Sequence, residues 1–172
     1  MTNKKLLLAA SIVLFVGSGL LFWGSNFAKT MIHDQLSEQK IVFNSKETLE
    51  KAGEKGEILK YAGQTVDTGT EARIYSEYIK GHLQKVAGGK TYSEVSTEYQ
   101  KDTKNTTLSG QRTTLFMGET LRGLLLNAYG WGIVGMIAFY AGIAIFAAAI
   151  ILLFVVIGMQ NKKIAKRKTA KK

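Results

Sequence analysis

The chain has 172 residues, neither cysteine nor proline, and a formal net charge of +10. Without cysteine, disulfides, thiolate catalysis and cysteine-ligated metal sites are excluded. The ends carry nine of the 23 Lys and Arg residues, whereas all 13 carboxylates lie between residues 24 and 130. The nearly neutral middle does not support a nucleic-acid-binding face.

Residues 6–23 form the first apolar stretch and contain no charge, after a short N-terminus (residues 1–5) that contains Lys4 and Lys5. Eighteen helical residues would extend about 27 Å, close to the hydrocarbon thickness of a bilayer. We therefore expect a transmembrane helix here. A cleaved signal peptide is the alternative, but the run is long for one and no small-residue cleavage motif follows Trp23.

The region of residues 24–130 is predicted to be a small helical domain. The first helix is expected to continue to Phe43 and to be interrupted at Asn44 and Ser45. Asn44 and Glu47 have the spacing of a capping box, which predicts a charged, weakly helical stretch to about Tyr61.

The strongest soluble helix is predicted to start at about Thr70 and to stop at the Gly88-Gly89 pair. Its expected apolar face consists of Ala72, Tyr75, Ile79, His82 and Val86, widened by Tyr78 and Leu83. Thr91 and Glu94 then predict a capped short helix. A polar loop over residues 101–110 and a further helix from Gln111 are expected to lead into the second span.

Residues 131–159 form the second apolar stretch without a charge and the second predicted span. Its 29 residues would extend about 44 Å, so tilting or emergence of one end must absorb the excess. Trp23 ends the first run, and Tyr129 and Trp131 precede or begin the second. These three residues predict an aromatic belt at one membrane interface.

A basic tail, residues 160–172, follows the second span and contains Lys162, Lys163, Lys166, Arg167, Lys168, Lys171 and Lys172. Short basic flanks stay cytoplasmic, so both termini are expected in the cytoplasm and residues 24–130 outside a cell membrane. The tail is also expected to contact anionic lipid headgroups. The predicted fold class is an all-α membrane protein with two antiparallel transmembrane helices and a small helical extracytoplasmic domain.

Small residues recur every seven positions in both spans. One set is Ala10, Gly17 and Gly24, and the other is Ala128, Gly135, Gly142 and Ala149. Seven residues is close to two helical turns, so each set forms one stripe. Because small residues allow close approach of helices in lipid, we expect the stripes to form a packing seam. The alternative is that Gly and Ala are simply common in membrane spans.

No residue pattern predicts an enzyme, a metal site or a cofactor. His33-Asp34 and His82 are too few for a zinc site, and His82 is expected to be a core residue of its helix. Carboxylates 47–57 alternate with lysines, which is typical of a solvated helix face. No phosphate-binding loop or nucleophile motif is present in the sequence.

Residues 62–69, 89–95 and 118–127 resemble segments of uncharacterised two-span bacterial envelope proteins. The resemblance covers nearly the whole chain. It implies a location in a bacterial cytoplasmic membrane and supplies no catalytic or ligand-binding residue.

Two function classes follow. The first is a non-enzymatic membrane interaction or accessory protein, which binds an envelope protein through tyrosines of the external helices. The alternative is a membrane sensor or small-ligand-binding module, which would need a pocket with convergent polar groups. A transport function is disfavoured because the spans contain no ionisable residue. The sequence leaves the partner, ligand and oligomeric state open.

Overall fold

The structure is a computed structural model that describes the backbone of residues 3–169 and the side chains of residues 4–160. The protein is all-helical, with 83% helix and no strand in the described residues. The elements are α1 (Asn3–Glu38), α2 (Lys46–Lys51), the 3-10 helix η1 (Gly56–Tyr61), α3 (Gly69–Ala87), α4 (Tyr92–Lys101) and α5 (Thr106–Thr169).

The described chain forms two compact units. The two-helix unit consists of residues 3–28 of α1 and 134–169 of α5, and the central unit consists of residues 29–133. Both α1 and α5 contain a stretch that is long and apolar enough to cross a membrane.

Helix α1 ends at Glu38, five residues before the predicted end at Phe43. Lys40 adopts a φ of +51°, which breaks the helix. The following segment pairs with residues 64–66: the Phe43 amide donates to the Gln64 carbonyl at 2.9 Å and the Val66 amide donates to the Ile41 carbonyl at 2.8 Å. The prediction of a longer helix was wrong because this tertiary pairing prevails over local helix propensity.

Helix α2 is capped one residue later than predicted. The Ser45 side chain, rather than that of Asn44, accepts a hydrogen bond from the Thr48 amide. The helix is also short, since Gly53 and Gly56 adopt φ values of +83° and +77°. Only glycine takes such angles without strain, so the pair separates α2 from η1.

Helices α3 and α4 both begin with a complete capping box, Thr68 with Glu71 and Thr91 with Glu94. The Thr91 and Glu94 prediction is therefore confirmed. Gly88, at a φ of +59°, ends α3 where the sequence predicted a stop.

Helix α5 begins at Thr106, five residues before the predicted start at Gln111. The Asn105 side-chain oxygen accepts a hydrogen bond from the Leu108 amide at 3.0 Å. This local cap converts part of the predicted loop into helix.

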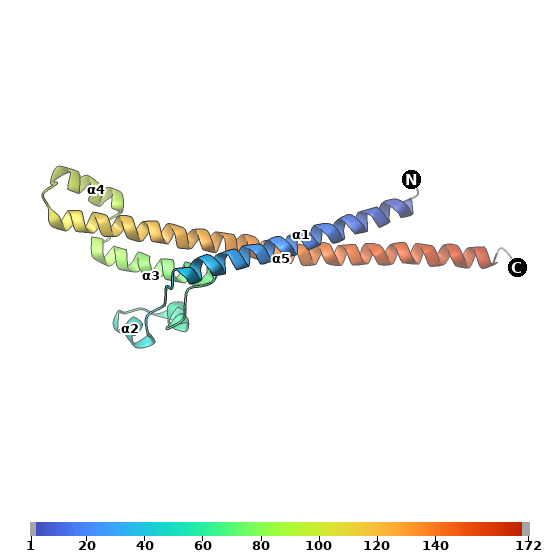
Figure 1. The fold of residues 1–172 in the computed structure, drawn as a ribbon, viewed down its shortest axis with the longest axis horizontal. Coiled ribbons are helices and arrows are strands. Elements are labelled where there is room, and N and C mark those ends of the chain that lie inside the picture. The colour runs from blue at the N-terminus through green and yellow to red at the C-terminus, as the bar shows by residue number, and fades with distance from the viewer. Residues whose placement is uncertain (1–2, 170–172) are drawn as a thin grey trace. The chain divides into compact units, whose positions relative to one another are not determined.

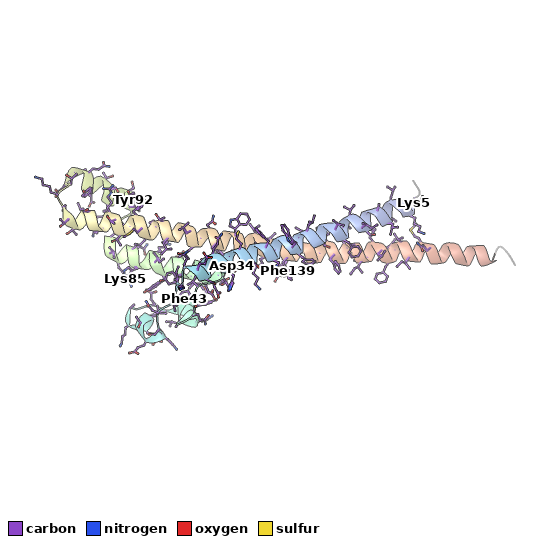
Figure 2. All side chains as sticks on the ribbon, viewed as in Figure 1. Lys5, Asp34, Phe43, Lys85, Tyr92 and Phe139 are labelled. Carbon is purple, nitrogen blue, oxygen red and sulfur yellow. The ribbon has the colours of Figure 1, made fainter. Side chains whose placement is uncertain are left out.

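The central unit is built around two hydrophobic clusters. Phe43, labelled in Figure 2, packs with Leu49, Val66 and Leu125 in the first cluster. The second cluster contains Leu83 and Ala87 of α3, Val95 of α4 and Leu115 of α5. In Figure 1, α3 and α4 lie alongside the first half of α5, which supplies a residue to each cluster.

The predicted apolar face of α3 is buried or partly buried except at His82. Ala72, Ser76 and Leu83 are buried, whereas His82 is exposed. The expectation of a core histidine was therefore wrong. Gly69 at the start of α3 faces α5, and the ring of Tyr75 packs edge-on against that of Phe43, with centroids 5.2 Å apart.

Candidate functional site

The two-helix unit contains a stripe of small residues on α5 at the predicted heptad positions. Gly135, Gly142 and Ala149 are all buried, and Val156 continues the same spacing. A Cβ atom on Gly135 would lie 3.2 Å from the Cβ of Ala28 and one on Gly142 would lie 2.9 Å from Cε1 of Phe22. The α5 stripe is thus where α1 approaches most closely.

On α1 the buried residues lie one position after the predicted stripe. Ser11 and Ser18 are each 1% exposed, whereas Ala10 is exposed and Gly17 and Gly24 are partly exposed. A Cβ on Gly17 or Gly24 would meet no atom within 4 Å outside its own helix in the described chain. Successive residues on a helix are about 100° apart, so a shift of one position selects a different face.

The buried serines are satisfied within their own helix. Ser11 donates to the Leu8 carbonyl and Ser18 to the Phe15 carbonyl, both at 2.8 Å. Each therefore acts as a small residue with no unpaired hydroxyl. Sequence reasoning overlooked these serines, although Ser11, Ser18 and Ser25 also recur every seven residues.

Aromatic side chains surround this small-residue contact. The ring centroids of Phe15 and Phe146 are 5.5 Å apart, and those of Phe22 and Phe139 are 5.8 Å apart, both in edge-to-face geometry. Such pairs add about 0.5–1.5 kcal/mol beyond area burial in water. Figure 2 labels Phe139 on α5.

The other predicted site residues are distributed between the units. Ala128 lies in the central unit, where its carbonyl oxygen would be 3.2 Å from a Cβ on Gly69. Trp23 belongs to the two-helix unit and Tyr129 and Trp131 to the central unit, so the aromatic belt stays a prediction. Trp23 is exposed and stacks on Phe27, with centroids 5.7 Å apart. The basic residues 162–172 lie outside the described side chains.

A groove of about 350 Å³ lies in the central unit. Its walls come from residues 31–41 and from residues 121–128 of α5. Most lining side chains are apolar, among them Met31, Leu121 and Leu124, and three side-chain amides lie among them. These are Gln35, Gln39 and Asn127, and Glu38 is the one carboxylate among the lining residues.

Arg122 links α5 to α3. Its side chain is 15% exposed and pairs with Glu119, as the spacing allowed. Its Nε also donates to the carbonyl oxygen of Ser76 at 3.2 Å. This contact joins positions 46 residues apart, which no signal in one sequence could have revealed.

Two polar clusters contain groups with shifted pKa values. The Asp67 carboxylate lies 3.7 Å from Nδ1 of His33, and Glu71 accepts hydrogen bonds from the amides of Asp67 and Thr68. Burial, and then the Glu71 carboxyl group, raises the pKa of Asp67, while His33 opposes the shift. This cluster holds the start of α3 against α1.

In the second cluster, the neighbouring Ser96 hydroxyl and then the Arg112 guanidinium lower the pKa of Tyr92. The Arg112 guanidinium carbon lies 5.1 Å from the centroid of the Tyr99 ring, a cation–π distance. These contacts join α4, labelled in Figure 2 by Tyr92, to the first turns of α5.

Across the described residues, no group of three or more His, Cys, Asp or Glu side chains could hold a metal ion.

Comparison of the chain with family models, with curated proteins and with solved structures found no match.

Proposed function

We propose that the protein is a two-span integral membrane protein with a helical domain outside the membrane. The observation that carries this proposal is the exposure of the apolar side chains in the two-helix unit. Only 11% and 17% of the residues in the most apolar windows of α1 and α5 are buried. A core helix of a soluble protein would be mostly buried, whereas lipid would cover these side chains.

The order of contacts supports an antiparallel pair of spans. Phe15 contacts Phe146, and farther along α1 Phe22 contacts Phe139. Later residues of α1 thus meet earlier residues of α5. Such a hairpin places both chain ends on the same side, and the basic flanks favour the cytoplasmic side.

A labelling experiment in intact cells tests this topology. The natural chain contains no cysteine, so Ser45→Cys, Thr103→Cys and Thr169→Cys each introduce one thiol. An impermeant maleimide is expected to label the first two variants and to label the third only after permeabilisation. The reverse pattern would contradict the orientation, and release of the protein by alkaline carbonate would contradict membrane insertion.

Within this framework the protein acts as a non-enzymatic interaction or accessory protein through its external domain. Apolar residues exposed on α5 of the central unit support this role: Phe116, Met117 and Leu124 are 58%, 59% and 66% exposed. Exposed apolar surface of this kind is typical of interaction sites. Crosslinking in native membranes followed by mild solubilisation is expected to give a complex, and recovery of the lone chain would contradict the role.

The second candidate function is a ligand-binding or sensory module. The groove in the central unit favours it, since three amides and one carboxylate lie among its apolar lining residues. Ligand sites in proteins are commonly apolar and contain a few placed polar groups. Pull-down of a protein partner would favour the first role, and a bound small molecule in purified protein would favour the second.

A further inference from the structure

One side of α5 in the central unit leaves large apolar side chains exposed. We call this side, within residues 113–131, the free face. Its large apolar residues are Phe116, Met117, Leu124 and Trp131. The buried residues Leu115 and Leu125 belong to the two hydrophobic clusters and mark the inward side of the same helix. A contiguous apolar surface on a domain outside the membrane is typical of an interaction site.

The residues of the free face have the spacing of a helix-pairing surface. Thr113, Thr120 and Asn127 recur every seven positions, and all three are exposed. Each large apolar residue of the face lies three or four positions from one of them. This is the repeat by which parallel helices pack in a coiled coil. Over residues 113–131 the face is about 27 Å long.

The free face contains no charged residue, although residues 24–130 contain all 13 carboxylates and 14 of the 23 Lys and Arg residues. Complementary charges commonly select a partner of different sequence. Two parallel copies of one helix instead place each residue beside its own copy, so any charge on the face would repel itself. The absence of charge therefore favours a second copy of this chain as the occupant.

The polar groups of the free face are also compatible with self-pairing. The hydroxyl groups of Thr113 and Thr120 donate to the carbonyl oxygens of Ser109 and Phe116 at 3.0 and 2.7 Å, so they need no donor contact outside α5. The side-chain amide of Asn127 can both donate and accept, so it can bond to Asn127 of a second copy. One asparagine in such a seam fixes the register of parallel helices.

We propose that the protein self-associates through the free face, with α5 of two copies packed in parallel. This inference rests on the proposed topology and interaction role. Copies inserted in one membrane with the same orientation carry their α5 helices in the same direction, so a parallel pair can form between their external domains. The second copy is then the partner on which the interaction role depends.

Disulfide formation by the full chain in native membranes tests the pairing. The natural chain has no cysteine, so Thr120→Cys places a single thiol on the free face. Under mild oxidation this variant is expected to form a linked dimer at least about ten times faster than Leu126→Cys. Leu126 is also exposed on α5, but it lies about 120° around the helix from Thr120. Equal rates would overturn the proposal.

A charge-exchange experiment separates repulsion from misfolding. Gly123 lies on the free face, and a Cβ there would meet no atom within 4 Å outside its own helix in the described chain. Gly123→Glu and Gly123→Lys are each expected to weaken self-association about tenfold or more through like-charge repulsion. Expressed together with different tags, the two variants are expected to co-purify. Undiminished self-association of each variant alone, or failure of the mixed pair to form, would overturn the parallel pairing.

Two differently tagged copies of the natural chain distinguish failure of this inference from failure of the interaction role. After crosslinking in native membranes, both tags are expected in one complex. Recovery of one tag with a different protein would overturn self-association and leave the interaction role intact. Recovery of single, uncrosslinked chains would overturn both.

Discussion

Gly69 at the start of α3 lies directly against Gly132 of α5: a Cβ on Gly132 would be 3.6 Å from the Gly69 Cα. A Cβ on Gly69 would lie 3.2 Å from the Ala128 carbonyl oxygen and 3.3 Å from the Tyr129 Cα. The two helices therefore approach backbone to backbone. Any side chain at residue 69 must displace the backbone of α5, because no flexible group can give way.

Gly69→Ala is therefore expected to destabilise the central unit by about 1–3 kcal/mol. Unfolding in detergent, followed by circular dichroism, measures the change. Gly130→Ala is the matched control on α5, since its added Cβ would meet no atom within 4 Å outside its own helix in the described chain. The control should be neutral or more stable by up to about 1 kcal/mol. Equal effects of the two variants would contradict the close approach.

Ala28 and Gly135 offer a direct test of the two-helix unit. A Cβ on Gly135 would lie 3.2 Å from the Cβ of Ala28, near the roughly 3.5–4.5 Å found in disulfides. The double variant Ala28→Cys/Gly135→Cys is expected to form an intramolecular disulfide under mild oxidation, seen as a mobility shift that reductant reverses. Gly24→Cys/Gly135→Cys is the control, and faster oxidation of the control pair would rule out this helix pairing.

Gly118 is in close contact with Leu83. A Cβ on Gly118 would lie 2.6 Å from one Leu83 methyl carbon and 2.7 Å from the other. Gly118→Ala is expected to destabilise the protein by about 1–3 kcal/mol through overpacking, and Leu83→Ala by about 2–5 kcal/mol through a cavity. The double variant should lose less stability than the sum of the two single losses, because the methyl group added at residue 118 can occupy the space that Leu83→Ala leaves. Strict additivity in denaturant unfolding would argue against the contact.

Arg122→Met should destabilise the packing of α3 against α5 by about 1–3 kcal/mol, because it removes the donor to the Ser76 carbonyl and the partner of Glu119. Arg122→Lys is expected to recover only part of the loss, since an ammonium group lacks the planar fork of a guanidinium. Hydrogen exchange of α3 amides provides the readout. Unchanged exchange in Arg122→Met would show that the bond to Ser76 contributes little.

The raised pKa of Asp67 predicts how the stability of the folded protein depends on pH. Its pKa is raised above 3.8 in the folded protein, chiefly by burial. A raised carboxyl pKa contributes stability at low pH that is lost as the pH rises through the folded pKa. Asp67→Asn is therefore expected to have a higher Tm than the natural chain at pH 7 and to lose this advantage below the ordinary pKa of 3.8.

Asp34→Asn, a change at an exposed carboxylate on α1, is the control for this pH series. A Tm of Asp67→Asn below that of the natural chain at pH 7 would mean that attraction to His33 outweighs burial.

The features that the sequence could predict are those set by local chemistry. Charge-free runs predict the two long apolar helices, and Thr91 with Glu94 predicts the start of α4 from its cap alone. The end of α1 could not be predicted in this way, because residues 41–43 bond to residues 64–66. The α1 face that contacts α5 was also ambiguous, since Gly17 and Ser18 both belong to sets spaced by seven residues and period alone cannot choose between them.

The two hydrophobic clusters of the central unit determine when the unit can finish folding during synthesis. The first cluster needs Ile32 and Leu36 near the start of the unit and Leu125 near its end, and the second needs Leu115. A chain that emerges N-terminus first therefore exposes α3 and α4 before the residues that bury them have been synthesised. The domain can close only when α5 has been synthesised, so completion of its core depends on the same helix that continues into the second proposed span.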